Sequence, residues 1–192
     1  MSEQTLLVVK PDGVQRALSG EIISRLEKAG LKIVAMKMLK ASREMIEKHY
    51  TTSEEFLRGM GGKTIATYKE FGGDVMTEMG TTDELELGKK IREWLIDFLS
   101  SDPVVAVVFE GHHAVTQMRK IVGATVPCFA NPGTIRGDYT TDAPDLANAK
   151  KRPVKNLVHA SGSVEEAKSE IALWFKPEEI MSYKRCDEEV RE

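Results

Sequence analysis

The sequence predicts an α/β sandwich, with an antiparallel sheet whose strands are connected by helices. Runs of apolar or alternating residues over 5–10, 31–39, 104–109 and 155–159 have the length and period of strands. Segments with apolar residues at helical spacing separate these runs. Glycine, proline and aspartate residues mark the ends of both kinds of segment. The resulting order is a βαββαβ core with extra helices, which is the ferredoxin-like arrangement.

Turn chemistry defines several of these elements. The first strand ends at Lys10-Pro11-Asp12-Gly13, because proline cannot extend a central ladder and Pro-Asp-Gly favours a turn. Residues 19–29 have helical spacing, and Gly30 follows as a natural C-cap. The run at 104–109 is apolar throughout, so it is expected to be a central strand. Further helices are expected at 42–50, 85–99, 114–122 and 163–175.

Composition is that of an intracellular globular protein. The chain has 192 residues, which suits one domain over 1–192. Its 27 lysines and arginines nearly balance 30 acidic residues, which argues against a dedicated nucleic-acid binder. Two cysteines make neither a disulfide framework nor a metal cluster. No stretch approaches the roughly 20 apolar residues of a membrane span, and nothing resembles a signal peptide, so a cytoplasmic location is expected.

The stretch from Lys155 to Ser163 is the candidate functional centre. It reads as a short strand, a sharp turn and a helix start, with His159 at the end of the strand. Ser163-Val164-Glu165-Glu166 has the form of a capping box, which places backbone N–H groups beside the histidine. Glu170 lies one helical turn after Glu166, from where its carboxylate is expected to reach the imidazole and fix its tautomer.

Three motifs carry a family resemblance. Asn156-Leu157-Val158-His159-Ala160-Ser161 resembles the active-site signature of nucleoside diphosphate kinases. Val9-Lys10-Pro11-Asp12-Gly13-Val14 and Pro132-Gly133-Thr134-Ile135-Arg136-Gly137-Asp138 also resemble that family, in the same order along the chain. The resemblance implies the ferredoxin-like fold and transfer of the γ-phosphate of a nucleoside triphosphate to a nucleoside diphosphate. It also implies a ping-pong reaction through a phosphohistidine on His159.

The resemblance implies roles for the other site residues. His159 attacks the γ-phosphorus through one ring nitrogen while the other donates a hydrogen bond towards Glu170. Lys10 and Ser161 support the transferred group. The nucleotide-binding set that it implies is Lys10, Tyr50, Arg119, Thr125, Arg136 and Asn156; guanidinium groups suit this task because they bind phosphate oxygens bidentately.

The resemblance also implies a cofactor and an assembly. Mg²⁺ is expected to be held mainly by the nucleotide phosphates rather than by protein ligands. The family implies a homo-oligomer, a hexamer or a tetramer, with no membrane partner. Because His159 must be neutral to attack, activity is expected to fall as the pH drops through the pKa of the histidine.

The chain departs from the compact family pattern in three regions. Insertions are expected at about 51–88 and 140–153, and a charged tail covers 178–192. Glycines within Arg58-Gly59-Met60-Gly61-Gly62-Lys63-Thr64 resemble a phosphate-binding loop, but a leucine replaces its first glycine and no buried strand precedes it. This segment is therefore read as a flexible glycine-rich loop. A surface hairpin is the favoured interpretation of 140–153, ahead of a subunit contact or a lid.

Single positions also depart from the family pattern. The family stacks the base on a phenylalanine, and the matching position here is Ile91; Phe56, Tyr68 and Phe71 remain open as substitutes. Gly162 stands where the family often has an aspartate near the metal, which bears on how Mg²⁺ is positioned. Ala160 replaces a common glycine, a change that is expected to be harmless.

Two other classes of function remain as alternatives. One is a nucleotide-binding regulatory homologue whose insertions serve a protein partner, and the set of Lys10, Arg119, Arg136 and His159 argues against it. The other is an RNA-recognition module, since the ferredoxin-like fold also carries such domains. Those modules need sheet-face aromatics in a characteristic pattern, which the six Phe, four Tyr and two Trp do not form.

Overall fold

The structure is a computed structural model that describes residues 2–186 of the chain. Two compact units make it up. A sheet unit comprises Met1–Leu39, Val104–Val122 and Val158–Glu192, and a helical unit comprises Lys40–Pro103 and Gly123–Leu157. The expectation of one domain over the whole chain stays a prediction.

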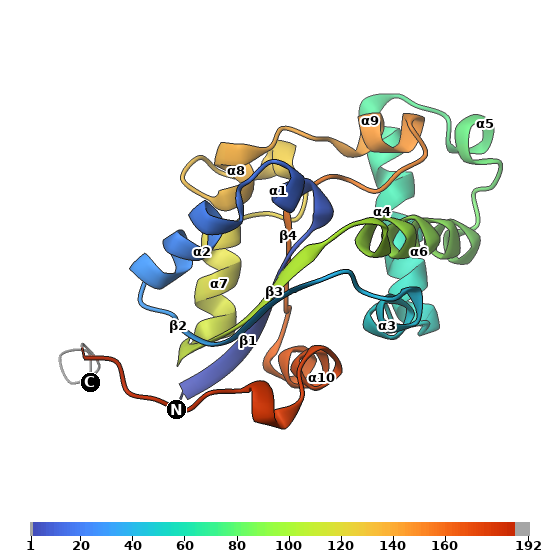
Figure 1. The fold of residues 1–192 in the computed structure, drawn as a ribbon. Helices are drawn as coiled ribbons and strands as arrows, with labels where there is room; N and C mark the ends of the chain where they lie inside the picture. Colours follow the sequence, from blue (N-terminus) through green and yellow to red (C-terminus); the bar gives the residue numbers. More distant parts are fainter. Residues whose placement is uncertain (1, 187–192) are drawn as a thin grey trace. The chain divides into compact units, whose positions relative to one another are not determined.

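The sheet unit confirms the ferredoxin-like prediction (Figure 1). Its four strands lie in the order β2-β3-β1-β4, and each neighbouring pair is antiparallel. The register of β1 on β3 runs from Ser2 opposite His112 to Val9 opposite Val105. The strands are β1 (Ser2–Val9), β2 (Lys32–Leu39), β3 (Val104–His112) and β4 (Val158–Ala160).

Strand β1 is buried on both faces. Successive strand residues point to opposite faces, and each residue of Leu6-Leu7-Val8-Val9 is 0% exposed. Helices α7 (Ala114–Val122) and α10 (Val164–Trp174) contact β1, and α2 (Ser19–Lys28) contacts α7. Short helix α1 (Pro11–Gln15) begins where β1 ends, with proline at its first position. The burial of this strand fixes the position of its end, where Lys10 follows.

The tail after α10 packs along the edge strand β2. After the turn η2 (Pro177–Glu179), the N–H group of Met181 donates to the carbonyl of Val34 at 2.7 Å. The hydroxyl of Tyr183 donates to the carbonyl of Ile33 at 2.8 Å. These bonds occupy part of the free edge of β2. The remainder of the predicted tail, 187–192, lies outside the described residues.

The helical unit contains both expected insertions, 51–88 and 140–153. Its elements are α3 (Arg43–His49), α4 (Glu54–Phe71), α5 (Val75–Met79), α6 (Glu84–Ser101), η1 (Pro127–Phe129), α8 (Ile135–Tyr139) and α9 (Pro144–Ala149). Helix α4 packs against α6, and α3 and α9 contact this pair. None of the helices in residues 2–186 is long and apolar enough to span a membrane.

The expectation of a flexible glycine-rich loop was wrong. The segment belongs to α4, which Ser53 caps at its start and Gly72 ends with a left-handed φ of 71°. Gly61 lies against the backbone of Glu84, and Gly88 of α6 lies against the backbone of Leu57. A Cβ atom at either glycine would overlap the carbonyl of the other helix. These glycines therefore allow two helices to pack closely rather than making a loop.

The first insertion has a hydrophobic cluster of its own. Tyr68, Val75, Met79 and Leu87 are buried together, with Ile65, Ile91 and Trp94 packed against them. The hydroxyl of Tyr68 donates to Oε2 of Glu78 at 3.1 Å. Burial and this hydrogen bond raise the pKa of Tyr68 to about 12. The insertion is thus a packed helical structure.

The surface-hairpin interpretation of 140–153 was also wrong, because this segment contains the helix α9. Its two ends are joined by Arg152, whose Nη1 and Nη2 atoms donate to the two carboxylate oxygens of Asp142 at 2.6 and 2.9 Å. The N–H group of Lys155 donates to the same carboxylate at 2.7 Å. Burial opposes ionisation of Asp142, but these bonds outweigh it and lower the pKa of its carboxyl.

Candidate active site

His159 lies on β4, directly opposite Val8 of β1. The strand is shorter than the sequence predicts: it begins at Val158, because Leu157 has a left-handed φ of 68° that an extended strand does not allow. Such a conformation is costly for a leucine and is typical of functional segments. This conformation of Leu157 turns the chain into β4 two residues before His159.

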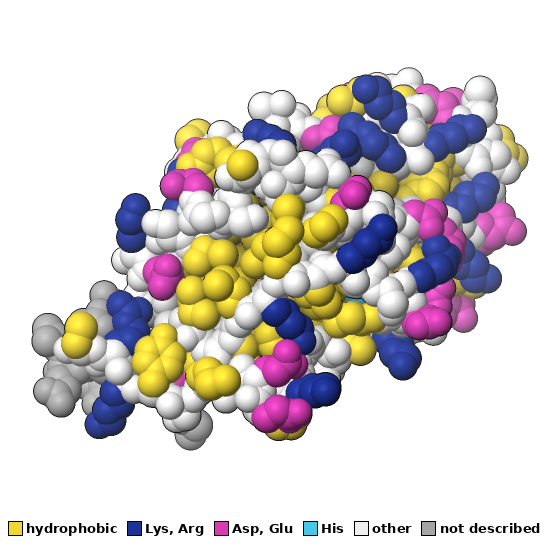
Figure 2. Space-filling model, in the orientation of Figure 1, with side chains coloured by type: hydrophobic (Ala, Val, Ile, Leu, Met, Phe, Trp, Pro, Cys, Tyr) yellow, Lys and Arg dark blue, Asp and Glu magenta, His cyan; other side chains and the backbone are white. Residues whose placement is uncertain are grey.

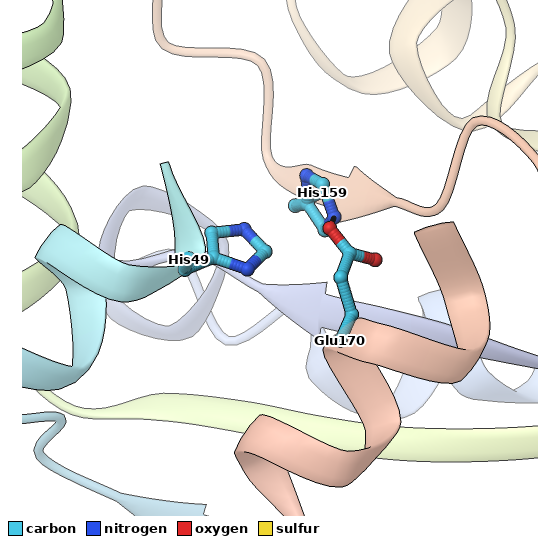
Figure 3. Close-up of side chains that lie close together, drawn as sticks. All are labelled: His49, His159 and Glu170. Carbon is cyan, nitrogen blue, oxygen red and sulfur yellow. Dashed lines mark ion pairs between the residues drawn. The ribbon is translucent and has the colours of Figure 1, made fainter. Parts of the chain in front are cut away.

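A carboxylate oxygen of Glu170, on α10, lies close to one ring nitrogen of this histidine (Figure 3). The Nε2 atom of His159 lies 2.7 Å from Oε1 of Glu170. The other carboxylate oxygen accepts a hydrogen bond of 2.6 Å from the hydroxyl of Ser161, and that hydroxyl accepts one of 3.3 Å from the N–H group of Leu6. Ser161 is 0% exposed and Glu170 is 6% exposed, so the carboxylate is fixed by partners rather than by water.

Lys10 lies at the end of the neighbouring strand. Its backbone, with φ −73° and ψ 168°, continues the extended conformation of β1 by one residue. Because side chains alternate between faces, Lys10 lies on the same face as Val8, and therefore on the same face as His159. The Lys10 side chain is 5% exposed. A lysine as buried as this is unusual, so Lys10 is a candidate functional residue.

Glu166 occupies the space left by the glycine at 162. Its Oε2 atom accepts a hydrogen bond of 2.7 Å from the N–H group of Gly162, and lies 2.5 Å from where a Cβ atom of that residue would stand. The Nη1 atom of Arg119, on α7, lies 3.8 Å from the same point. The predicted capping box is modified: the hydroxyl of Ser163 accepts from the Glu166 N–H group at 3.1 Å, but the Glu166 carboxylate binds one residue earlier than in the usual pattern.

In the helical unit, Arg136 is a buried cation held by backbone carbonyl groups. Its side chain is 6% exposed. Its Nε atom donates to the carbonyl of Asn156 at 3.1 Å, and its Nη1 atom donates to the carbonyl of Gly123 at 3.0 Å. Charge-assisted bonds of this kind fix the plane of the guanidinium group.

The Pro132–Asp138 motif is a tight turn and helix start that positions Arg136. The side chain of Thr134 caps α8 by accepting from the N–H group of Gly137 at 3.1 Å. The N–H group of Gly133, whose φ is 86°, donates to Oδ1 of Asp138 at 2.7 Å. A Cβ atom at Gly137 would overlap the carbonyl of Asn131. Gly133 therefore permits the left-handed φ of this turn, and Gly137 permits the close approach of the backbone of Asn131.

Asn156 and Thr125 are joined in the same unit. The Nδ2 atom of Asn156 donates to the carbonyl of Thr125 at 2.8 Å, and Asn156 is 5% exposed. Together with the bond from Arg136 to the Asn156 carbonyl, this links three of the predicted nucleotide-binding residues. The sequence offers no signal for these side chain–backbone hydrogen bonds, because Asn156 lies 31 positions from Thr125 and 20 positions from Arg136.

Tyr50 ends helix α3, and its ring packs edge-on against that of His49 with centroids 4.9 Å apart. Its carbonyl accepts a hydrogen bond of 2.9 Å from Nε of Arg92. Among the open candidates for base stacking, Tyr68 is 5% exposed, whereas Phe56 and Phe71 are 37% and 46% exposed. Ile91 packs against the Tyr68 cluster.

The predicted site residues therefore form two groups, each within one unit. Lys10, Arg119, His159, Ser161 and Glu170 belong to the sheet unit, with Tyr50, Thr125, Arg136 and Asn156 in the helical unit. The structure adds the carboxylate of Glu166, which sequence reasoning placed only in a helix cap. Within the sheet unit, a buried carboxylate close to a histidine, together with a lysine and an arginine, suits phosphoryl transfer through a histidine.

Comparisons with known proteins agree with this chemistry. The family model described as "Nucleoside diphosphate kinase" matches residues 3–58 and 84–180. A nucleoside diphosphate kinase of Pyrobaculum aerophilum is 54% identical over 179 residues, which cover 93% of this chain and 98% of that protein. The unmatched residues between 58 and 84 cover most of α4 and all of α5.

Solved structures of such kinases share the fold. A crystal structure of the NDP kinase from Pyrobaculum aerophilum has a TM-score of 0.92 at 51% identity, with 95% of this chain and 100% of that one covered. A transition-state mimic of the Borrelia burgdorferi enzyme, with bound vanadate and ADP, has a TM-score of 0.77 at 36% identity, with 97% and 95% covered. This chain therefore belongs to the nucleoside diphosphate kinase family, enzymes that transfer the γ-phosphate of a nucleoside triphosphate to a nucleoside diphosphate.

Proposed function

We propose that this chain carries out the family reaction with Nδ1 of His159 as the nucleophile. The contact between His159 and Glu170 supports this assignment, because a carboxylate beside Nε2 stabilises the positive charge that the imidazole gains when Nδ1 attacks. In the first half-reaction the Nδ1 lone pair forms a bond to the γ-phosphorus while the bond to the departing diphosphate oxygen breaks. In the second, an oxygen of the accepting diphosphate displaces the imidazole and takes the phosphoryl group.

Glu170 and Ser161 are proposed to act on the histidine rather than on the nucleotide. During attack the imidazole gains positive charge, which the Glu170 carboxylate stabilises. The Ser161 hydroxyl is fully buried and already bonded to Glu170 and Leu6. Its contribution to transfer is therefore to hold Glu170 in place, and this replaces the direct contact with the phosphate that the resemblance implies.

The remaining residues are proposed to bind the nucleotide. Lys10 on the face of His159 neutralises charge on the transferred phosphoryl group. Arg119 and Arg136 bind phosphate oxygens, and the fixed guanidinium plane of Arg136 supports an orienting role. Thr125, Asn156 and Tyr50 complete the set by ordering the sugar and phosphates.

Mg²⁺ is the proposed cofactor. Both oxygens of Glu170 are engaged by protein groups, so this carboxylate does not serve as a metal ligand. Glu166 is exposed and supplies a hard oxygen donor beside Gly162, where the family often has an aspartate. The nucleotide phosphates would hold the ion, and Glu166 would accept hydrogen bonds from water molecules bound to it. The ion would neutralise phosphate charge during transfer.

A homo-oligomer in the cytoplasm is proposed, as the family implies. Met36 and Met38 of edge strand β2 are 57% and 62% exposed. Figure 2 shows hydrophobic side chains gathered over the strands of the sheet unit. An edge strand with exposed apolar side chains is a typical contact surface between copies of a chain. Size-exclusion chromatography with light scattering measures the number of subunits.

Phosphate exchange tests the proposed activity. The protein is incubated with Mg²⁺, GDP and ATP labelled at the γ-phosphate, and labelled GTP is measured. We expect rapid label transfer by the wild type and none by His159→Asn, with binding of ADP retained in both. Nucleotide binding without transfer by the wild type would favour the regulatory homologue instead.

A further inference from the structure

A pocket of about 330 Å³ opens between helices α4, α5 and α9 of the helical unit. Its volume lies within the range of small-molecule sites. Tyr68, Phe71, Gly73 and Glu78 line one side, and all of them lie in the part of the chain that the family model leaves unmatched. The pocket is therefore a feature of the inserted helices, and the family reaction does not account for it.

Two aromatic rings form an apolar wall. Tyr68 is 5% exposed and its hydroxyl is bonded to Glu78, so its ring is fixed. Phe71, one helical turn later, keeps 46% of its surface exposed. Gly73 leaves room beside these rings, because a Cβ atom there would stand 2.7 Å from Cδ1 of Tyr68. An exposed ring beside a fixed one offers a π face to a ligand.

The opposite wall comes from α9 and is polar. Asn148 is 7% exposed, and among residues 2–186 its side-chain amide has no hydrogen-bond partner. This amide can both donate a hydrogen bond to a ligand in the pocket and accept one from it. The carboxylate of Asp145, exposed at the same wall, has no ion-pair partner within the described part of the chain.

The charge of the lining selects the class of ligand. Glu78 and Asp145 contribute two carboxylates, and none of the described residues that line the pocket is lysine, arginine or histidine. A nucleotide polyphosphate would meet only negative charge here. An ammonium group meets carboxylates for ion pairing, ring faces for cation–π attraction, and the amide oxygen of Asn148 as an acceptor.

We propose that this pocket binds an aliphatic ammonium ligand, a small amine or polyamine. One ammonium group would lie between the ring of Phe71 and the carboxylates of Glu78 and Asp145, with an N–H bond to Asn148. The alkyl chain would rest on the Tyr68 and Phe71 rings. Occupation would tie α4 and α5 to α9, and so join the two insertions through a ligand.

Calorimetric titration with spermidine at constant ionic strength tests the proposal. We expect saturable one-to-one binding to the wild type. Phe71→Ala, Glu78→Gln and Asp145→Asn each weaken it by about threefold or more, the size expected for loss of a cation–π or carboxylate contact. All three side chains are at least partly exposed, so these variants keep the core; circular dichroism and thermal unfolding check this.

Matched control residues lie on α4, outside the pocket. Phe56→Ala and Glu55→Gln make the same chemical changes as Phe71→Ala and Glu78→Gln, and both are expected to leave spermidine binding unchanged. Equal weakening by pocket and control variants would overturn the proposal in favour of diffuse surface attraction. No spermidine binding, together with adenosine or ADP binding that Phe71→Ala abolishes, would also overturn it and make the pocket a base-binding site.

Discussion

The Nε2 atom of His159 lies 2.7 Å from Oε1 of Glu170, whose second oxygen is bonded to the buried hydroxyl of Ser161. The imidazole is therefore oriented by a carboxylate that is itself oriented by a hydroxyl and, through it, by the backbone of β1. A ring held in this way needs little reorganisation when its other nitrogen attacks phosphorus. This arrangement supports the proposed role of His159, the middle residue of the three-residue strand β4, as the nucleophile.

Replacing Glu170 by glutamine should separate catalysis from nucleotide binding. The variant keeps the size of the side chain but loses the charge that stabilises the imidazolium, so kcat is expected to fall about 10- to 100-fold, as for other groups that orient a functional histidine. KM for nucleotides should change little, because Glu170 is buried away from solvent. Steady-state kinetics measure both constants.

Glu165→Gln is the matched control, since it removes a carboxylate from the exposed part of the same helix. Its kcat should equal that of the wild type. A Glu170→Gln enzyme with unchanged kcat would contradict the orienting role of Glu170.

Most of the sheet unit could be predicted from the sequence, because strand length, helical spacing and turn residues are local signals. The helices at 114–122 and 164–174 begin or end within a residue or two of the expected positions. The four-helix arrangement of α4, α5, α6 and α9 could not be predicted in this way. In particular, the close packing of α4 on α6 depends on Gly61 and Gly88, each of which meets the backbone of the other helix, a contact between residues far apart in sequence.

Substitutions at the glycines of α4 test this account of the insertion. Gly61→Ala should lower the free energy of unfolding by about 1–3 kcal/mol, because its methyl group would overlap the backbone of Glu84. Gly59→Ala, on the same helix with open space around it, should raise it by about 0.5–1 kcal/mol. Urea denaturation measures both values. Equal effects of the two substitutions would show that α4 and α6 do not pack in this way.

Titration of Tyr68 reports on the packing of the same insertion. Its pKa of about 12 lies above the value near 10 of an unfolded tyrosine. Since the folded state holds the phenolic proton of Tyr68 more tightly than the unfolded state does, the raised pKa stabilises the fold. This stabilisation is complete below about pH 10 and is lost as the pH rises through about 12. Absorbance at alkaline pH should reveal a tyrosine that ionises near 12, and Tyr68→Phe should remove that step. A wild-type protein whose tyrosines all ionise near 10 would contradict the burial of Tyr68.

The candidate site could be predicted only in part. The residue types and their order gave His159, Lys10 and Arg136 as candidates, and the i to i+4 relation suggested that Glu170 follows Glu166 on one face. The backbone bonds of Arg136 to Gly123 and Asn156, and the reach of Glu166 to Gly162, had no sequence signal. The left-handed conformation of Leu157 was likewise hidden, because leucine rarely adopts it.

The position of the phosphoryl group on the enzyme tests the central claim most directly. The protein is incubated with Mg²⁺ and ATP labelled at the γ-phosphate, the acid-labile, alkali-stable product is isolated, and NMR determines which imidazole nitrogen carries phosphorus. The account predicts one phosphoryl group on Nδ1 of His159, discharged by GDP and absent from His159→Asn. Phosphorus on Nε2, or label on another residue, would contradict it.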